Sequence, residues 1–395
     1  MIYSYGFKNY FGFKEGAEIS FELNSRVPKG ISNGRDVATI LGVKGANGAG
    51  KTNLLKALYF ISTFSTESFK SNADDEINAD SYFESKEPSA FYIDFRSADI
   101  RYTYELAVTH KEVVYERLYR KNYSADSLGK KTRKVLVFER DGNKIVKRLE
   151  EISSIDVIAL KSNASLISTA YHYKFESPLL MLNDVYDFFN GFMSNVGYTG
   201  LHDISLSTER IHKTTLSYFN NKEAFDFVKS LIISSDLGIS DIKILDRVDD
   251  SGKKIYFPVF EHIVDGKAHT LTIYDQSSGT KSLYVKLHLY WLTLVLGGVL
   301  ILDEFDLNFH PLMLPKLLDL FESKVTNPLN SQFIFTSHIT EVLEKLSKFR
   351  TYLVNKDDNE CYCYRLDEIG GDLLRHGRPI APIYNEGKLG GVPKL

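Results

Sequence analysis

The chain has 395 residues, of which 43% are hydrophobic and 25% are charged, and its formal net charge is −3. These values are typical of a globular protein with one large domain or two ordinary domains, and they exclude a uniformly basic chain that coats nucleic acid. The longest apolar run, from Trp291 to Leu302, is too short to cross a membrane, and the N-terminus lacks the pattern of a signal peptide. Cys361 and Cys363 lack the spacing of a metal site. We therefore expect a cytoplasmic protein that does not bind membranes.

The first predicted elements are β-strands that lead to a glycine-rich loop. The apolar run from Val37 to Val43 precedes GANGAGKT at residues 45–52, and a helical pattern starts at Asn53. The loop fits the phosphate-binding pattern GxxxxGK[ST], and a strand before it and a helix after it are the context that this motif requires. Glycines allow backbone N–H groups to face phosphate oxygens, and the start of the following helix adds positive partial charge.

The residue types at the end of this loop indicate how a nucleoside triphosphate would be held. Lys51 supplies a positive charge for the β- and γ-phosphates, and Thr52 offers a hydroxyl group to Mg²⁺. The predicted ligands are therefore ATP and Mg²⁺. The residues predicted to bind the nucleotide at this loop are Asn47, Gly48, Ala49, Gly50, Lys51, Thr52 and Asn53.

The middle of the chain divides into stretches of different pattern. Residues 90–149 alternate between apolar and polar residues and predict a β-meander, with a hairpin turn at Asp141-Gly142. Residues 165–238 show helical patterns without heptads, so we expect a helical insertion with no coiled-coil arm. Residues 241–274 return to strand patterns.

An apolar strand that starts at Gly298 ends in two adjacent carboxylates, Asp303 and Glu304. Such a strand is buried, so carboxylates at its end require a cation or a proton. This is a Walker B pattern, in which Asp303 holds Mg²⁺ through water and Glu304 positions and deprotonates the attacking water. A further strand, residues 332–336, is followed by His338, which is placed to contact the γ-phosphate.

Four elements in one order resemble the ABC-type head ATPases, a group that includes the SMC, RecF-like and OLD-like proteins. They are the phosphate-binding loop, a Ser-Gly pair at a helix start, the Walker B strand and a strand that ends in Ser-His. The chain is more closely similar to stand-alone bacterial AAA-type ATPases of phage-defence operons, the AbiL-like proteins. The segments that carry this resemblance are Lys8-Asn9-Tyr10, the shortened signature Ser278-Gly279-Thr280, the Walker B and D-loop residues 303–311 and the tail residues 384–393.

The resemblance implies an α/β P-loop NTPase fold, namely an ABC-type ATPase head with an N-terminal antiparallel β-subdomain and a helical insertion. The N-terminal part of the head would be residues 1–164, the insertion residues 165–238 and the C-terminal part residues 239–395. The resemblance also implies ATP hydrolysis in a homodimer or higher oligomer promoted by ATP. Ser278 and Gly279 of one subunit would contact the γ-phosphate bound by the other, and the dimer would regulate a separately encoded effector, such as a nuclease, in anti-phage defence.

Three positions depart from the pattern of these relatives. The signature reads SSGTK rather than LSGGQ, and Phe11 stands where the DNA-repair members often have arginine. The place of the Mg²⁺-sensing loop is assigned to Lys161-Ser162-Asn163, which contains no glutamine.

Other functions stay open at this stage. Residues 355–358 match NKxD, the guanine-reading motif of GTPases, but the segment after Asp303 lacks the D-x-x-G that a GTPase requires, and a polar hairpin turn explains the match. An ATP-gated scaffold without useful turnover, which restrains a toxic nuclease, is one alternative. A DNA-maintenance ATPase is another, although no basic stripe in the sequence supports contact with nucleic acid.

Overall fold

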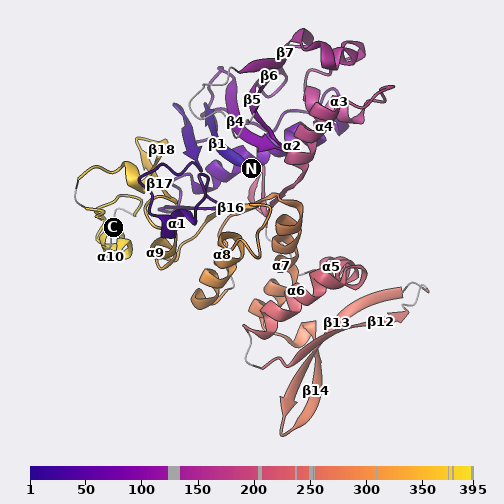
Figure 1. Cartoon of the computed structure of the whole chain (residues 1–395), viewed down its shortest axis with the longest axis vertical. Coiled ribbons are helices and arrows are strands. Elements are labelled where there is room, and N and C mark those ends of the chain that lie inside the picture. Colours follow the sequence, from indigo (N-terminus) through magenta and orange to yellow (C-terminus); the bar gives the residue numbers. More distant parts are fainter. Residues whose placement is uncertain are drawn as a thin grey trace.

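The computed structural model describes residues 1–122, 134–202, 207–235, 238–248, 252, 254–307, 309–371, 373–375 and 378–392. Two sheets and the helices around them form the body of the molecule (Figure 1). A smaller lobe, within residues 208–275, extends from the body at the bottom of this view. Among the helices of the described residues, none combines the length and the apolar character needed to cross a membrane.

The sheet that carries the predicted motifs has six strands in the order β18-β17-β3-β16-β15-β9. Its strands are β3 (Ile40–Gly45), β9 (Phe192–Ser194), β15 (Val299–Leu302), β16 (Gln332–Thr336), β17 (Thr351–Asp357) and β18 (Glu360–Arg365). Neighbouring strands are parallel from β17 to β9, and β18 pairs antiparallel with β17 at one edge. Every residue of β3, β15 and β16 is buried, which explains why these strands are mainly apolar.

The second sheet is antiparallel and has seven strands in the order β2-β1-β4-β5-β6-β7-β8. Its strands are β1 (Ile2–Lys8), β2 (Ala17–Ser20), β4 (Ser89–Ser97), β5 (Ile100–Val108), β6 (Val113–Asn122), β7 (Val135–Asp141) and β8 (Lys144–Arg148). Strands β4 to β8 pair in chain order, so the predicted meander is confirmed. The turn between β7 and β8 lies at Gly142, as the Asp-Gly pair predicts.

Helix α2 (Lys51–Glu67) lies between the two sheets. It contacts β1 of the antiparallel sheet and β3, β15 and β16 of the parallel sheet. Leu54, Leu58 and Ile61 are fully buried, and the hydroxyl of Tyr5 in β1 donates a hydrogen bond to the carbonyl oxygen of Leu54 at 3.1 Å. Packing on both sides therefore holds the helix that follows the glycine-rich loop.

The interval expected to be one helical insertion, 165–238, divides into two parts in the structure. Helices α3 (Leu166–His172) and α4 (Leu180–Asn190) pack on α2 in the main core, and β9 joins the parallel sheet beside β15. A short hairpin follows, formed by β10 (Val196–Gly197) and β11 (Gly200–Leu201). Only α5 (Thr208–Asn220) and α6 (Lys222–Ile233) belong to the lobe. The helical pattern predicts an apolar face, but it does not predict the hydrophobic core in which that face packs.

The lobe also contains a three-stranded antiparallel sheet of β12 (Asp241–Val248), β13 (Lys254–Val264) and β14 (Lys267–Thr272). Helix α7 (Ser278–Leu296) joins it to the body and leads into β15. The hydroxyl of Tyr218 in α5 donates to the carbonyl oxygen of Tyr284 in α7 at 2.7 Å. The remaining helices are α1 (Lys29–Ser32), α8 (Leu314–Glu322), α9 (Val342–Leu346), α10 (Ile380–Asn385) and the 3₁₀ turns Ser68–Lys70, Glu150–Val157, Ile273–Asp275, Pro311–Met313 and Leu366–Glu368.

Candidate active site

Four neighbouring strands end at the same edge of the parallel sheet, and each ends in polar residues. The glycine-rich loop follows β3, Asp303 follows β15, and Ser337 and His338 follow β16. Asn195 follows β9. Because carboxyl ends of parallel strands meet at one edge, the fold brings segments from distant parts of the chain together.

The loop between β3 and α2 has the backbone that its glycines predict. Gly48 and Gly50 have φ angles of 75° and 103°, which residues with a Cβ atom rarely adopt. The side chain of Lys51 is 8% exposed and folds back along the loop, where its Nζ donates to the carbonyl oxygens of Gly45 and Ala46 at 3.0 and 3.1 Å. The lysine is therefore already placed within the curve of the loop, where phosphate oxygens would lie.

The pKa of Lys51 is affected by burial and by the carboxylates around it. Burial lowers the pKa of Lys51, while the negative charges of Asp303, Glu304 and Asp306 act in the opposite direction. An anionic ligand at the loop would add to the effect of the carboxylates and favour the charged form.

Asp303 is the centre of the hydrogen bonds at this edge, and it is only 4% exposed. Its Oδ2 accepts from the hydroxyl of Thr52 at 2.7 Å, and its Oδ1 accepts from the hydroxyl of Thr336. The side chain of Asn195 binds its backbone twice, because Nδ2 donates to the Asp303 carbonyl oxygen and Oδ1 accepts from the Asp303 N–H. A hydroxyl group and a carboxylate that converge at the start of α2 fit a hard divalent cation such as Mg²⁺, which takes few protein oxygens besides phosphate and water.

Glu304 has a strained backbone and a partly exposed side chain. Its φ angle is 47°, and its N–H donates to the Thr336 hydroxyl oxygen at 2.8 Å. Its side chain is 41% exposed, and its Oε1 lies 3.8 Å from Nε2 of His338. The backbone N–H of His338 faces the carboxylate of Asp306 at 3.3 Å. The structure thus places Lys51, Thr52, Asp303, Glu304 and His338 in one cluster.

A comparison with protein families shows the family to which the chain belongs. The family model described as "AAA domain, putative AbiEii toxin, Type IV TA system" matches residues 40–344, which is more than half of the chain. The chain belongs to this family. The sequence resemblance to ATP-binding P-loop ATPases and the predicted α/β fold of an ABC-type head are therefore confirmed.

Two solved structures of the recombination mediator protein RecF in the RecFOR pathway, one with ATPrS and one with ATP, are similar to this ATPase. Both are 11% identical, with TM-scores of 0.33 and 0.32. They cover 92% of this chain, and the matches extend over 98% and 95% of the RecF chains. No curated protein matches the chain. We therefore infer the roles of residues in this ATPase from its own geometry.

The predicted signature residues, Ser278 and Gly279, lie at the start of α7. Ser277 caps α7, where its hydroxyl oxygen accepts from the N–H of Thr280 at 3.1 Å. Ser278 is exposed and Gly279 is partly exposed. Among the described residues, the contacts that join Lys51 to Asp303 and Glu304 do not include them. Within the D-loop, Asn308 lies outside the described residues, as does Pro393 of the tail.

Two side chains of the cluster were not predicted from the sequence, namely Asn195 and Thr336. The Mg²⁺-sensing position was assigned to 161–163, but Lys161 Nζ donates to the carbonyl oxygens of Phe69 and Ser71. Asn195 instead follows the strand beside Walker B. Its signal in the sequence is weak, because β9 has only three residues and interrupts a helical pattern.

The NKxD match does not form a guanine site. Asn355 Oδ1 accepts from the N–H of Gly391 at 2.6 Å, and Asn355 Nδ2 donates to the hydroxyl of Tyr364 at 3.2 Å. Asp358 lies in the turn between β17 and β18 with a φ angle of 43°. The segment is a hairpin that holds the C-terminal turn, so the polar-turn interpretation is confirmed.

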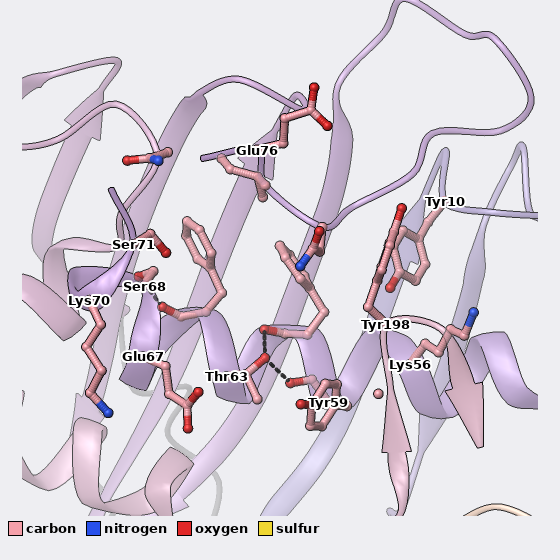
Figure 2. A pocket seen from close by; sticks show the side chains of 16 residues that line it. Tyr10, Lys56, Tyr59, Thr63, Glu67, Ser68, Lys70, Ser71, Glu76 and Tyr198 are labelled. Carbon is pink, nitrogen blue, oxygen red and sulfur yellow. Dashed lines mark hydrogen bonds between the residues drawn. The ribbon is translucent and has the colours of Figure 1, made fainter. Parts of the chain in front are cut away.

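A groove of about 380 Å³ runs along α2 beyond the phosphate-binding loop. Figure 2 shows Lys56, Tyr59, Thr63 and Glu67 on successive turns of the helix, with Tyr198 at the end near Lys56. The groove is lined by aromatic, acidic and basic side chains, and the phosphate-binding loop, Asp303, Glu304 and His338 do not line it. The predicted phosphate site is therefore at the start of α2, and the groove lies along later turns of the same helix.

Proposed function

We propose that this ATPase hydrolyses ATP in a Mg²⁺-dependent reaction at the cluster of Lys51, Thr52, Asp303 and Glu304. The observation that carries the proposal is the 2.7 Å hydrogen bond between Thr52 and Asp303, which joins two motifs 251 residues apart. Lys51 would bind the β- and γ-phosphates, and Thr52 and Asp303 would hold Mg²⁺. When bound, the metal would neutralise charge on the phosphates and orient the γ-phosphate.

Glu304 is placed to act as the general base. It follows Asp303 directly, its carboxylate is water-accessible, and the Thr336 hydroxyl holds its backbone. A water molecule between Glu304 and the γ-phosphate would transfer a proton to the carboxylate as it attacks phosphorus. His338 faces both this carboxylate and the open edge, so it would contact the γ-phosphate and respond to its loss.

We further infer that a second subunit closes the site. Glu304 and His338 are 41% and 46% exposed, so water reaches the γ-phosphate face of a single subunit. At the start of α7, the helix supplies no carbonyl partners for the N–H groups of Ser278 and Gly279. These two donors of one subunit could bind the γ-phosphate held by the other and exclude water, which strengthens each electrostatic contact.

The dimer would in turn regulate a separately encoded effector, such as a nuclease, in anti-phage defence. Support for this step is the family description, which names an AbiEii toxin and a Type IV TA system. The sequence resemblance to ATPases of phage-defence operons points the same way.

The substitution Lys51→Ala tests the nucleotide site. It removes the only charge that the loop itself places on the phosphates, so we expect ATP binding to be lost and ADP formation to fall to background. Fluorescence titration with a labelled ATP analogue and an ADP assay with and without Mg²⁺ measure both effects. The control is Lys14→Ala, which changes an exposed lysine. Near-normal ATP affinity in Lys51→Ala would contradict the assignment.

A further inference from the structure

Lys44 is a buried lysine directly before the phosphate-binding loop. It lies in β3, next to Gly45, and is 4% exposed. Among the described residues, its Nζ has no hydrogen-bond partner, although Nζ lies 5.2 Å from the centre of the Tyr384 ring. A buried ammonium group without a partner costs free energy, so its presence beside a phosphate site calls for an explanation.

The charged groups that face Lys44 come from several elements. Asp306 of the D-loop and Glu341 before α9 attract its charge, and Lys51 repels it. Burial is the largest effect, and it lowers the pKa of Lys44 to about 8. At neutral pH the group is therefore mostly charged, and no ion pair with it is formed within the described residues.

The C-terminal turn confines this charge. Tyr384 lies in α10, and its hydroxyl donates to the carbonyl oxygen of Gly391 at 2.8 Å. The N–H of Gly391 in turn donates to Asn355, which follows Val354 beside Gly45 in the sheet. The Tyr384 ring is thus fixed over the ammonium group of Lys44.

We propose that Lys44 is a second cation of the nucleotide site, which acts through space together with Lys51 and favours a nucleoside triphosphate over a diphosphate. Without a nucleotide, Lys44 bears its burial cost and the repulsion of Lys51, which the attraction of Asp306 and Glu341 offsets only in part. An anion at the loop offsets both, and it does so more strongly as its negative charge increases. This inference rests on the proposed phosphate site at Lys51.

The substitution Lys44→Met separates this role from a structural one. Methionine fills similar space without charge, so the nucleotide-free protein should melt at a higher temperature. We expect affinity for ATP to fall about tenfold and affinity for ADP to fall less, since one charge acts beyond direct contact through an effective dielectric constant of about 20. Titration with ATP and ADP and a thermal melt measure these effects. The control is Lys388→Met, which removes an exposed lysine of the C-terminal turn.

Two outcomes would overturn the inference. One is a wild-type ratio of ATP to ADP affinity in Lys44→Met; the other is a lower melting temperature with normal affinity, which would mark Lys44 as structural. If Lys44→Met does not fold, the same ratio is measured in the wild type from pH 7 to 9.5. Deprotonation of Lys44 should then reduce the preference for ATP above pH about 8, and a constant ratio contradicts the inference. ATP binding by Lys51→Ala would instead overturn the proposed site itself.

Discussion

A single threonine hydroxyl joins the two Walker B carboxylate residues. The hydroxyl of Thr336 donates to Asp303 and accepts from the backbone N–H of Glu304, and the residue is fully buried. It therefore orients the carboxylate assigned to the metal and the backbone of the residue assigned as base. Neither contact involves the nucleotide, so Thr336 is a positioning residue.

The substitution Thr336→Val keeps the shape of the side chain and removes both hydrogen bonds. We expect ADP formation to fall about 10–100-fold, because a hydrogen bond to a charged group contributes about 1.5–3 kcal/mol. Thr336→Ser retains the hydroxyl and should stay within a few-fold of the wild type. Equal turnover in the valine and serine variants would show that the hydroxyl does not position the carboxylates.

The sequence identifies some residues of the site and not others for a physical reason. Lys51, Asp303 and Glu304 lie in contiguous motifs whose neighbours already predict a loop or a buried strand. Thr336 and Asn195 contact Asp303 only because β16 and β9 both lie beside β15. That adjacency is set by long-range packing, which no local pattern in the chain reports.

At the scale of elements, the loop between β3 and α2 depends on close packing behind Gly50. A Cβ atom at this position would lie 2.9 Å from Sγ of Cys361 and 3.1 Å from a ring atom of Phe13. At Gly48 a Cβ atom would meet no atom within 4 Å, although φ is also positive. An alanine at Gly48 would therefore cause backbone strain alone, whereas an alanine at Gly50 would cause both backbone strain and a steric clash.

The pair Gly50→Ala and Gly48→Ala tests this difference. Both variants place an L-residue at a positive φ angle, which costs about 1–3 kcal/mol. We expect Gly50→Ala to lower the free energy of unfolding further and to weaken ATP binding more, because it also displaces Cys361 or Phe13. Chemical denaturation and ATP titration of both variants measure the effects. Equal losses would mean that packing against Cys361 does not support the loop.

The elements most readily predicted were those with long, regular patterns, such as the meander and the strand that precedes Asp303. The segment 165–238 was harder, since α3 and α4 have the same kind of apolar periodicity as α5 and α6 but pack in a different core. The three residues of β9 are too few to show alternation. Its place in the parallel sheet emerges only from its pairing with β15.

At the scale of the whole molecule, the proposed dimer would bring the start of α7 of one subunit to the Asp303 cluster of the other. The cluster around Asp303 lies at the edge of the parallel sheet, and Ser278 lies at the exposed start of α7. Association would therefore require ATP bound at the cluster of one subunit and an accessible α7 start on the other subunit. This predicts that assembly and hydrolysis fail together when the α7 start is blocked.

The substitution Ser278→Arg should block association and hydrolysis but leave ATP binding by the single subunit intact. A long side chain at this helix start would prevent close approach to the γ-phosphate of the other subunit. Light scattering of Glu304→Gln with ATP, with and without Ser278→Arg, measures the mass of the assembly. Ser230→Arg, at an exposed serine of α6, is the control. If all these proteins have the same mass, the signature assignment is wrong.

Hydrolysis by the Walker B carboxylate is tested by ADP formation in Glu304→Gln at saturating ATP, with ATP affinity measured on the same sample. Glutamine keeps the size of the side chain and cannot accept the proton of the attacking water. We expect ATP affinity to be retained and turnover to fall about 10²–10⁴-fold. Glu112→Gln, at an exposed glutamate of the β5–β6 turn, should behave as the wild type. Wild-type turnover in a Glu304→Gln protein that binds ATP would contradict the assignment of Glu304 as the base.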